Sequence, residues 1–330
     1  MDERKTDHIK LAFESQMARD QIDKRFNYEP LINPHLKDGL PPVEFMGKTL
    51  RTPMWVSSMT GGTKLARQIN RNLAKACHEF GMGMGLGSCR IILDNDTHLK
   101  DFDVRDVIGE DLPLYANLGI AQIETAVVNN DFTSIKDLVD KLRADGLIIH
   151  VNPMQESLQP EGDILTLSPI RTILSFLEKV DVKVIVKEVG QGMGPESLKH
   201  LLNMPLEAIE FAAFGGTNFA RLELLRSAPA EQDYYGPLAN IGHDACQMAE
   251  MVNQILEDNP AILCRQLIIS GGIKSFLDGY YLINKVKLNA IYGQASSFLR
   301  FAKEDYEQLK TFIEYQIRGL ELATAFLTVR

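Results

Sequence analysis

The stretch Gly146-Leu147-Ile148-Ile149-His150-Val151-Asn152-Pro153-Met154-Gln155-Glu156 joins a short apolar run directly to a cluster of polar side chains. The apolar half has the length and composition of a buried parallel strand. Buried polar groups must be paired or they destabilise a fold. A strand that ends in His, Asn, Gln and Glu therefore predicts a pocket filled with water or ligand. An ordinary solvated exit from a strand is the alternative for this stretch taken alone.

Seven further apolar runs accompany this one, and amphipathic stretches separate them. The predicted strands are 54–56, 83–86, 114–117, 147–151, 183–187, 208–211, 267–270 and 290–292. The predicted helices are 65–79, 120–128, 135–144, 170–179, 196–202, 245–257, 275–284, a short one near 297, and a long C-terminal helix, 304–325. Alternation of strands and helices favours a parallel α/β sheet, and eight repeats favour closure into a single (β/α)8 TIM barrel. An open doubly wound sheet is the alternative.

The first 50 residues are polar and differ from this pattern. Pro30, Pro34, Pro41 and Pro42 break up any long regular element. We therefore predict an N-terminal arm over residues 1–50 and a barrel domain over residues 51–330. Potential anion-binding side chains near the start of the arm could fold over a phosphate, and a solvated charged terminus is the alternative. These side chains are Arg4, Lys5 and His8.

Composition and charge exclude several classes of protein. The chain has 330 residues, of which 45% are hydrophobic, so it can bury a large core. A net charge of −9 disfavours general nucleic-acid binding. The charged N-terminus and the lack of a membrane-length apolar run predict a cytoplasmic protein with no membrane partner. Four scattered cysteines without a Cys-x-x-Cys pair argue against a zinc site or a disulfide framework.

Polar and glycine-rich clusters recur at the carboxyl ends of the predicted strands. Because these ends share one face of a (β/α)8 TIM barrel, we expect the clusters to line one site. Paired glycines let backbone N–H groups approach an anion, and the loops after strands seven and eight commonly bind phosphate. Gly271, Gly272, Gly293, Gln294 and Ala295 are therefore the predicted phosphate-binding residues, and simple tight turns are the alternative.

Lys187 ends the fifth predicted strand. The ammonium group of a lysine at this position could stabilise the electron-rich N1–C2=O edge of a reduced flavin. A Schiff-base lysine is a second functional interpretation, and a structural lysine that extends to solvent is the third.

Taken in order, the clusters resemble type 2 isopentenyl diphosphate isomerases, the flavin-dependent form, over nearly the whole chain. His150-x-Asn152-Pro153-x-Gln155-Glu156 is the most specific of the matching motifs. The others are Arg4-Lys5-x-Asp7-His8-Ile9, Ser57-Ser58-Met59-Thr60-Gly61-Gly62, Gly87-Ser88-x-Arg90, Ala116-Asn117-Leu118-Gly119, Val186-Lys187-Glu188-Val189-Gly190, Gly215-Gly216-Thr217 and Ser270-Gly271-Gly272-Ile273.

The resemblance implies conversion of isopentenyl diphosphate to dimethylallyl diphosphate by a 1,3-allylic proton shift. It implies reduced FMN and Mg2+ as cofactors, NADPH as the flavin reductant, and a homotetramer or homo-octamer. The substrate would be bound by Arg4, Lys5, His8, Arg90, His150, Asn152 and Gln155, with Gln155 facing the double bond as the catalytic residue and Glu156 helping to hold the metal. FMN would be bound by Ser58, Met59, Thr60, Ser88, Asn117, Lys187, Thr217, Gly271, Gly272, Gly293, Gln294 and Ala295.

The chain also departs from the family pattern near the expected flavin. Cys89 stands where Gln is usual, Phe211–Phe214 replace a small glycine-containing segment, and Tyr234–Pro237 retain only Gly and Pro of a Trp-Gly-Ile-Pro-Thr element. An FMN-dependent dehydrogenase or oxidase of the same barrel class is the alternative function, although such an enzyme needs a histidine base with arginines nearby. A non-catalytic flavin-binding barrel is the third.

Overall fold

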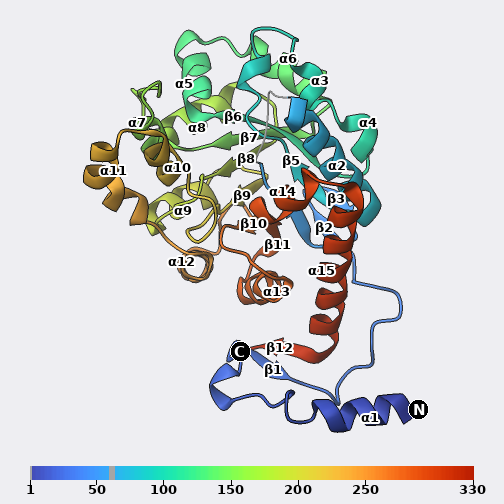
Figure 1. Ribbon diagram of the computed structural model, residues 1–330. Coiled ribbons are helices and arrows are strands. Elements are labelled where there is room, and N and C mark those ends of the chain that lie inside the picture. Colours follow the sequence, from blue (N-terminus) through green and yellow to red (C-terminus); the bar gives the residue numbers. More distant parts are fainter. Residues whose placement is uncertain (1, 59–63) are drawn as a thin grey trace.

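Eight parallel strands close into one barrel in the computed structural model, which describes residues 2–58 and 64–330 (Figure 1). The last barrel strand, β11, pairs with the first, β4, through Tyr292 and Met54, so the sheet has no open edge. All eight predicted strands are present and the closed barrel is confirmed. The barrel strands are β4 (Met54–Val56), β5 (Gly83–Gly85), β6 (Leu114–Gly119), β7 (Gly146–His150), β8 (Val184–Lys187), β9 (Ala208–Glu210), β10 (Gln266–Ser270) and β11 (Asn289–Gln294).

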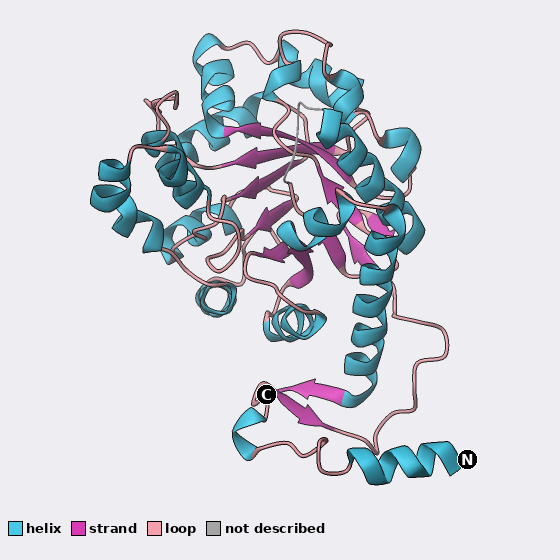
Figure 2. Cartoon of the chain, viewed as in Figure 1, coloured by secondary structure: helices cyan, strands magenta, loops and turns pink. Residues whose placement is uncertain are grey.

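The predicted helices surround this barrel, as Figure 2 shows. They are α2 (Lys64–Phe80), α5 (Ile120–Asn129), α6 (Thr133–Lys141), α8 (Pro169–Lys179), α9 (Pro195–Leu202), α12 (Ala245–Asp258), α13 (Phe276–Lys285), α14 (Ser296–Ala302) and α15 (Tyr306–Phe326). Their buried faces carry aliphatic residues such as Ile173 and Met248, because a helix beside a sheet needs one apolar stripe. No helix in the described part of the chain is long and apolar enough to span a membrane.

Short helices in the βα links were not predicted from the sequence. They are η2 (Arg90–Ile92), α3 (Leu99–Phe102) and α4 (Arg105–Ile108) after β5, α7 (Pro153–Leu158) after β7, and α10 (Phe219–Arg226), α11 (Pro229–Tyr235) and η3 (Gly236–Asn240) after β9. The arrowheads of the barrel strands in Figure 2 point toward the side where Figure 1 labels α7, α10 and α11. The helices α7, α10 and α11 therefore lie at the carboxyl face of the barrel, whereas α4 lies on the opposite side.

The N-terminal 50 residues contain more regular structure than their prolines suggested. A ten-residue helix, α1 (Asp2–Leu11), and the short helix η1 (Arg19–Gln21) both precede the first of those prolines. Strand β1 (Phe26–Tyr28) pairs antiparallel with β12 (Leu327–Val329). In Figure 1 this pair and α1 lie beyond the far end of α15.

The end of the predicted arm packs against the barrel. Strands β2 (Val43–Phe45) and β3 (Lys48–Leu50) form a hairpin whose Phe45, Met46 and Leu50 side chains are buried in the main hydrophobic core. Burial of these large apolar side chains stabilises the hairpin against the barrel by the ordinary hydrophobic effect.

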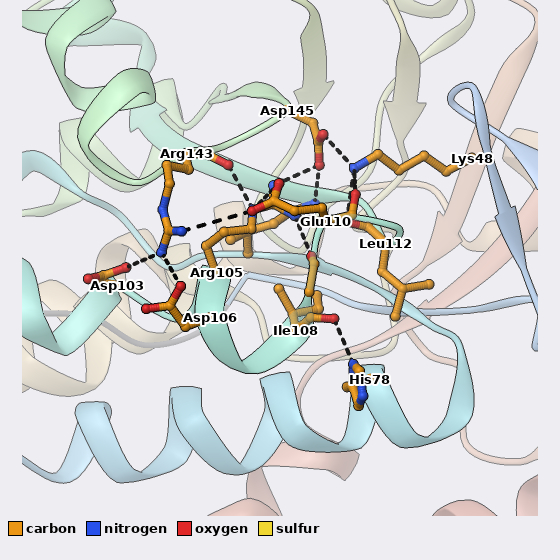
Figure 3. Close-up of polar contacts among 12 residues, drawn as sticks. Lys48, His78, Asp103, Arg105, Asp106, Ile108, Glu110, Leu112, Arg143 and Asp145 are labelled. Carbon is orange, nitrogen blue, oxygen red and sulfur yellow. Dashed lines mark hydrogen bonds and ion pairs between the residues drawn. The ribbon is translucent and has the colours of Figure 1, made fainter.

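A buried arginine joins several segments at the amino end of the barrel (Figure 3). The guanidinium of Arg105 is 1% exposed and donates to the carbonyl oxygens of Arg143, Gly109 and Leu112 at 2.8, 2.9 and 3.0 Å. Its Nη2 lies 2.9 Å from Asp145 Oδ2, and Asp145 also pairs with Lys48 of β3. Asp145 directly precedes β7, so this network anchors the strand that carries the His150 motif.

Candidate active site

Two adjoining cavities open at the carboxyl ends of the barrel strands. The glycine-lined cavity, of about 410 Å³, includes Gly215–Thr217, Ser270–Ile273 and Gly293–Ala295 in its walls. The His150 cavity, of about 220 Å³, is smaller. It is lined by Ser88, Arg90, Asn117, Gln122, His150, Asn152, Gln155, Glu156 and neighbouring residues. The two cavities adjoin, because both are lined by Ser58, Lys187, Val189 and Phe219.

Close backbone packing shapes the glycine-lined cavity. Gly271 and Gly272 have φ angles of +89° and +73°, a conformation that favours glycine. A Cβ atom on Gly271 would lie 2.1 Å from the carbonyl oxygen of Ala213, so no larger residue fits there without movement. The predicted phosphate-binding residues, which directly follow β10 or lie at the end of β11 and just after it, all line this cavity.

Buried polar groups form part of the same cavity. Glu210 is fully buried at the end of β9, and its Oε1 accepts a 3.0 Å hydrogen bond from Ser270 Oγ. Within the described part of the chain, Glu210 Oε2 and the hydroxyls of Ser57 and Ser58 have no hydrogen-bond partner. Unpaired buried polar atoms are costly, so their presence around a cavity indicates a polar ligand.

Two predicted cofactor residues use their side chains within the protein. Gln294 donates from Nε2 to Ile273 O at 3.1 Å and accepts from Gln316 Nε2 at 2.8 Å. Lys187 is 6% exposed, and its Nζ donates to Glu188 O at 2.8 Å while lining both cavities. The Gln294 side chain thus holds the cavity wall in place, whereas the Lys187 ammonium remains at the junction of the cavities.

His150 occupies the end of β7 beside Lys187 of β8, its cross-strand neighbour. The ring nitrogen Nδ1 lies 2.8 Å from Asn117 Oδ1, and Asn117 Nδ2 donates to Leu86 O at 3.0 Å. Desolvation by the surrounding protein and the positive charge of Lys187 lower the pKa of His150 to about 3. The imidazole is therefore neutral at physiological pH when the cavity holds no anion.

The polar residues of the His150 motif that follow β7 are connected by hydrogen bonds. Asn152 caps α7, and its Nδ2 donates to Gln155 Oε1 at 3.2 Å and to Glu156 Oε1 at 2.8 Å. Glu156 Oε2 accepts from the backbone N–H of Asp163 at 2.8 Å. The Pro153 that starts α7 fixes this turn, which brings Gln155 and Glu156 into the cavity wall.

Glu223 extends this series of hydrogen-bonded side chains, and the sequence alone did not predict it. Gln155 Nε2 donates to Glu223 Oε1 at 3.2 Å, although the two residues are 68 positions apart in the chain. Glu223 is 3% exposed, and its other oxygen pairs with Arg226 Nη1 at 2.5 Å. Helical spacing from Ala220 and Leu224 places this carboxylate on the buried face of α10, which is the signal that could have revealed it.

The remaining predicted cavity residues have distinct positions. Arg90 lies at the mouth of the His150 cavity with its side chain 59% exposed and paired with Asp163 at 2.9 Å. Ser88 lines the His150 cavity and Thr217 the glycine-lined cavity. Among the described residues, no group of three or more His, Cys, Asp or Glu side chains forms a metal cluster. Glu156 is the one carboxylate among the described residues that line the His150 cavity, and it lies beside Asn152, whose buried Oδ1 is unpaired.

Several predicted residues do not join these cavities. Arg4, Lys5 and His8 are exposed on α1, which Figure 1 shows apart from α7 and α10. Met59 and Thr60 lie outside the described residues.

Of the departures from the motif pattern, Cys89 and Phe211 are fully buried and fill space in the core. Tyr234 and Tyr235 are exposed on α11.

Comparison with known proteins identifies the family, although no family model matches the chain. The chain is 34% identical over 328 residues to the isopentenyl-diphosphate delta-isomerase of Rickettsia africae (strain ESF-5), covering 97% of this chain and 92% of that protein. The chain belongs to the isopentenyl-diphosphate delta-isomerase family. Another member, from Mycolicibacterium vanbaalenii, is 35% identical over 255 residues, which is 77% of this chain and 70% of that protein. Members of the isopentenyl-diphosphate delta-isomerase family are enzymes, and the resemblance seen in the motifs is confirmed.

Solved structures show that the barrel of this family member is shared with other proteins. The flavin-binding domain of baker's yeast flavocytochrome b2 superposes with a TM-score of 0.60 at 12% identity, covering 91% of this chain and 72% of that chain. A mandelate oxidase mutant with the monooxide FMN adduct gives 0.55 at 11% identity, covering 93% and 89%. At such low identity the likeness concerns the fold alone.

Proposed function

We propose that this protein converts isopentenyl diphosphate to dimethylallyl diphosphate by a 1,3-allylic proton shift. Reduced FMN would occupy the glycine-lined cavity, and the substrate would occupy the His150 cavity. The observation that carries this proposal is the Gln155–Glu223 hydrogen bond in the wall of a cavity that adjoins the glycine-lined one. It pairs the neutral amide of Gln155, which lines the proposed substrate cavity, with the buried carboxylate of Glu223.

The glycine-lined cavity fits FMN in its chemistry. Its unpaired Ser57 and Ser58 hydroxyls and Glu210 Oε2 offer partners to a polar ligand, and its glycine loops suit a phosphate. Lys187 would hold the electron-rich edge of the flavin, and the loops after β10 and β11 would hold its phosphate. When bound and reduced, with NADPH as reductant, FMN supplies an electron-rich ring that stabilises positive charge on the substrate.

The His150 cavity suits the diphosphate end of the substrate. Arg90 lines it and can donate hydrogen bonds to phosphate oxygens, and His150 can do so when it carries a proton on Nε2. Asn152 also lines it, but its Nδ2 already donates to Gln155 and Glu156, so Asn152 would position these two side chains beside the diphosphate. Glu156 also lines it, and a carboxylate beside a diphosphate is repulsive unless a cation lies between them. Oxygen ligands from one carboxylate and a substrate phosphate are the ligands that Mg2+ commonly uses, so we assign Glu156 to Mg2+.

Gln155 and Glu223 provide the proton-handling groups of the chain itself. A 1,3-allylic shift adds a proton to one alkene carbon and removes a proton two carbons away. Glu223 can hold a proton on its carboxylate, whereas Gln155 is neutral and cannot act as a primary acid. We assign Gln155 to positioning the alkene, with its own amide held by the hydrogen bond that its Nε2 donates to Glu223 Oε1.

The arm and the assembly remain proposals. Arg4, Lys5 and His8 would cap the substrate, which requires α1 to approach a carboxyl face that it does not contact in one chain. The arm exposes large apolar side chains, including Phe13 at 82% and Leu31 at 93%. Exposed apolar side chains of this kind fit a surface that another chain covers, and we propose a homotetramer or homo-octamer. A cytoplasmic location stays a prediction.

An FMN-dependent hydroxy acid dehydrogenase or oxidase is the second candidate, because flavocytochrome b2 and mandelate oxidase share the fold. Such an enzyme needs a histidine base with arginines to bind a carboxylate. Among the described residues that line the two cavities, His150 is the one histidine and Arg90 the one arginine. The site therefore supports the isomerase better.

The direct test is anaerobic turnover of isopentenyl diphosphate with FMN, NADPH and Mg2+. We expect dimethylallyl diphosphate as product, with solvent deuterium incorporated and no net consumption of NADPH. A substrate that bleaches oxidised flavin irreversibly without NADPH would instead identify an oxidase. Absence of deuterium exchange with fully reduced FMN and Mg2+ would favour a non-catalytic barrel.

Gly119→Ala is expected to raise the KM for isopentenyl diphosphate about tenfold, equivalent to about 1.4 kcal/mol of binding. A Cβ atom at Gly119 would lie 2.9 Å from His150 Nε2 and 2.7 Å from Gln122 Oε1, so both side chains must shift. Gly236→Ala is the matched control, because a Cβ there meets nothing within 4 Å. Steady-state kinetics that give equal KM values for both variants would contradict the proposal that the substrate binds in the His150 cavity.

A further inference from the structure

The amide of Asn117 has only one favourable orientation. Its Nδ2 donates to the carbonyl oxygen of Leu86 at 3.0 Å, so Oδ1 must face Nδ1 of His150 at 2.8 Å. Rotating the amide by half a turn would place an oxygen against the Leu86 carbonyl and leave that acceptor unpaired. Asn117 is 3% exposed, so water does not compensate for such a change.

This orientation decides where His150 carries its hydrogen. Because Asn117 Oδ1 can only accept, His150 Nδ1 must donate, and the neutral ring then has a bare Nε2. Within the described residues, Nε2 has no hydrogen-bond partner, and it lies next to Gly119 and Gln122. A bare imidazole nitrogen is an acceptor and repels a phosphate oxygen.

The groups around the ring explain why it changes its charge only with an anion present. Lys187 on β8 and Arg90 at the start of η2 contribute positive charge to the cavity, and Glu156 on α7 contributes negative charge. Desolvation and Lys187 disfavour the imidazolium in the free protein. A diphosphate adds negative charge beside the ring and offers a charge-assisted hydrogen bond, both of which favour a proton on Nε2.

We propose that Asn117 is a positioning residue that holds His150 in the Nδ1–H tautomer, so that a diphosphate binds together with a proton taken up at Nε2. This inference rests on the proposed function only in placing the diphosphate in the His150 cavity. It also gives Asn117 a role other than FMN contact, since both ends of its amide are engaged within the protein. Diphosphate affinity should then fall by about tenfold per pH unit as pH rises from the pKa of His150 in the free protein to its higher pKa in the complex, and level off above that.

Calorimetry of the FMN-loaded enzyme with inorganic pyrophosphate and Mg2+ tests this linkage. Titrations at one pH in two buffers with different ionisation enthalpies give the number of protons taken up. Wild type is expected to take up about one proton more than His150→Gln, and this subtraction removes protonation of pyrophosphate itself. Asn117→Asp would place a carboxylate against Nδ1–H, so uptake should decrease because the free enzyme already carries part of the proton.

Nitrogen-15 NMR of the histidine rings in the wild-type enzyme supplies a measurement that needs no variant, with His150→Gln used only to assign the His150 resonances. The Nδ1–H tautomer is expected in the free enzyme and the imidazolium with saturating pyrophosphate. An Nε2–H tautomer in the free enzyme, or a neutral ring in the complex, would overturn the inference. Equal proton uptake by wild type and His150→Gln would do so as well, while leaving the isomerase proposal intact. Failure of wild type to bind pyrophosphate would overturn the diphosphate placement and this inference together.

Discussion

Replacing Glu223 by glutamine is expected to lower the anaerobic isomerisation rate by about two to four orders of magnitude, the usual contribution of a positioned acid or base. Glutamine keeps the size of the side chain and can still contact Gln155, but it cannot hold the proton. The loss should appear in kcat, with a small effect on KM, because Glu223 lies beyond Gln155 and not among the proposed diphosphate contacts.

Glu161→Gln is the matched control for this experiment. Glu161 pairs with the same arginine, Arg226, at 2.8 Å, but its side chain is 57% exposed. Its replacement should leave turnover unchanged. Gln155→Ala and Glu156→Ala are both expected to lose most activity, through the alkene and through the metal respectively. If Glu223→Gln retained wild-type kcat, the carboxylate would be a structural partner of Gln155 and the proton would be handled elsewhere.

Replacing Arg105 by methionine is expected to destabilise the protein by about 3–5 kcal/mol, the usual result of removing one partner of a buried ion pair. The change leaves the carbonyl oxygens of Arg143, Gly109 and Leu112 without this donor, and removes one cation from Asp145 (Figure 3). Urea unfolding of the FMN-free protein, followed by circular dichroism, measures the free energy directly.

Arg143→Met is the control for this variant. The Arg143 side chain is 46% exposed and pairs with Asp106 at 2.8 Å, so its loss should destabilise the protein far less than the loss of Arg105. The folded Arg105→Met protein should keep its kcat, because Arg105 lies at the amino end of the barrel. A free energy of unfolding within about 1 kcal/mol of wild type would contradict the anchoring role that we assign to this buried pair.

Acid should weaken the same network. Burial acts to raise the pKa of Asp145, but hydrogen bonds from Lys48, the Leu114 N–H and Arg105 outweigh it and hold the pKa below its usual range. A carboxyl group whose pKa is lowered by folding stabilises the protein above its unfolded-state pKa. That contribution is lost as the pH falls through the lowered value, and Arg105→Met should reduce this acid dependence.

Some of the site could be predicted because the barrel converts chain order into position. The His150 motif, the glycine loops after β10 and β11, and Lys187 all follow apolar runs directly. Once the strands close into a barrel, their carboxyl ends must share one face, so these residues meet. Gln294 shows the limit of this reasoning, because its position was predicted correctly while its side chain is used by Ile273 and Gln316.

The sequence by itself determined the eight strands, the helices of the barrel and the family, because apolar periodicity and motif order are written along the chain. Only the tertiary structure decided which side chains from distant parts of the sequence pair with one another. It brought Glu223 to Gln155 from 68 residues away, oriented the Asn117 amide against His150, and buried Arg105 beside Asp145. It also left α1 apart from the carboxyl face. Local patterns report which face of an element is buried, whereas a hydrogen-bond partner is chosen by whatever the fold packs against that face.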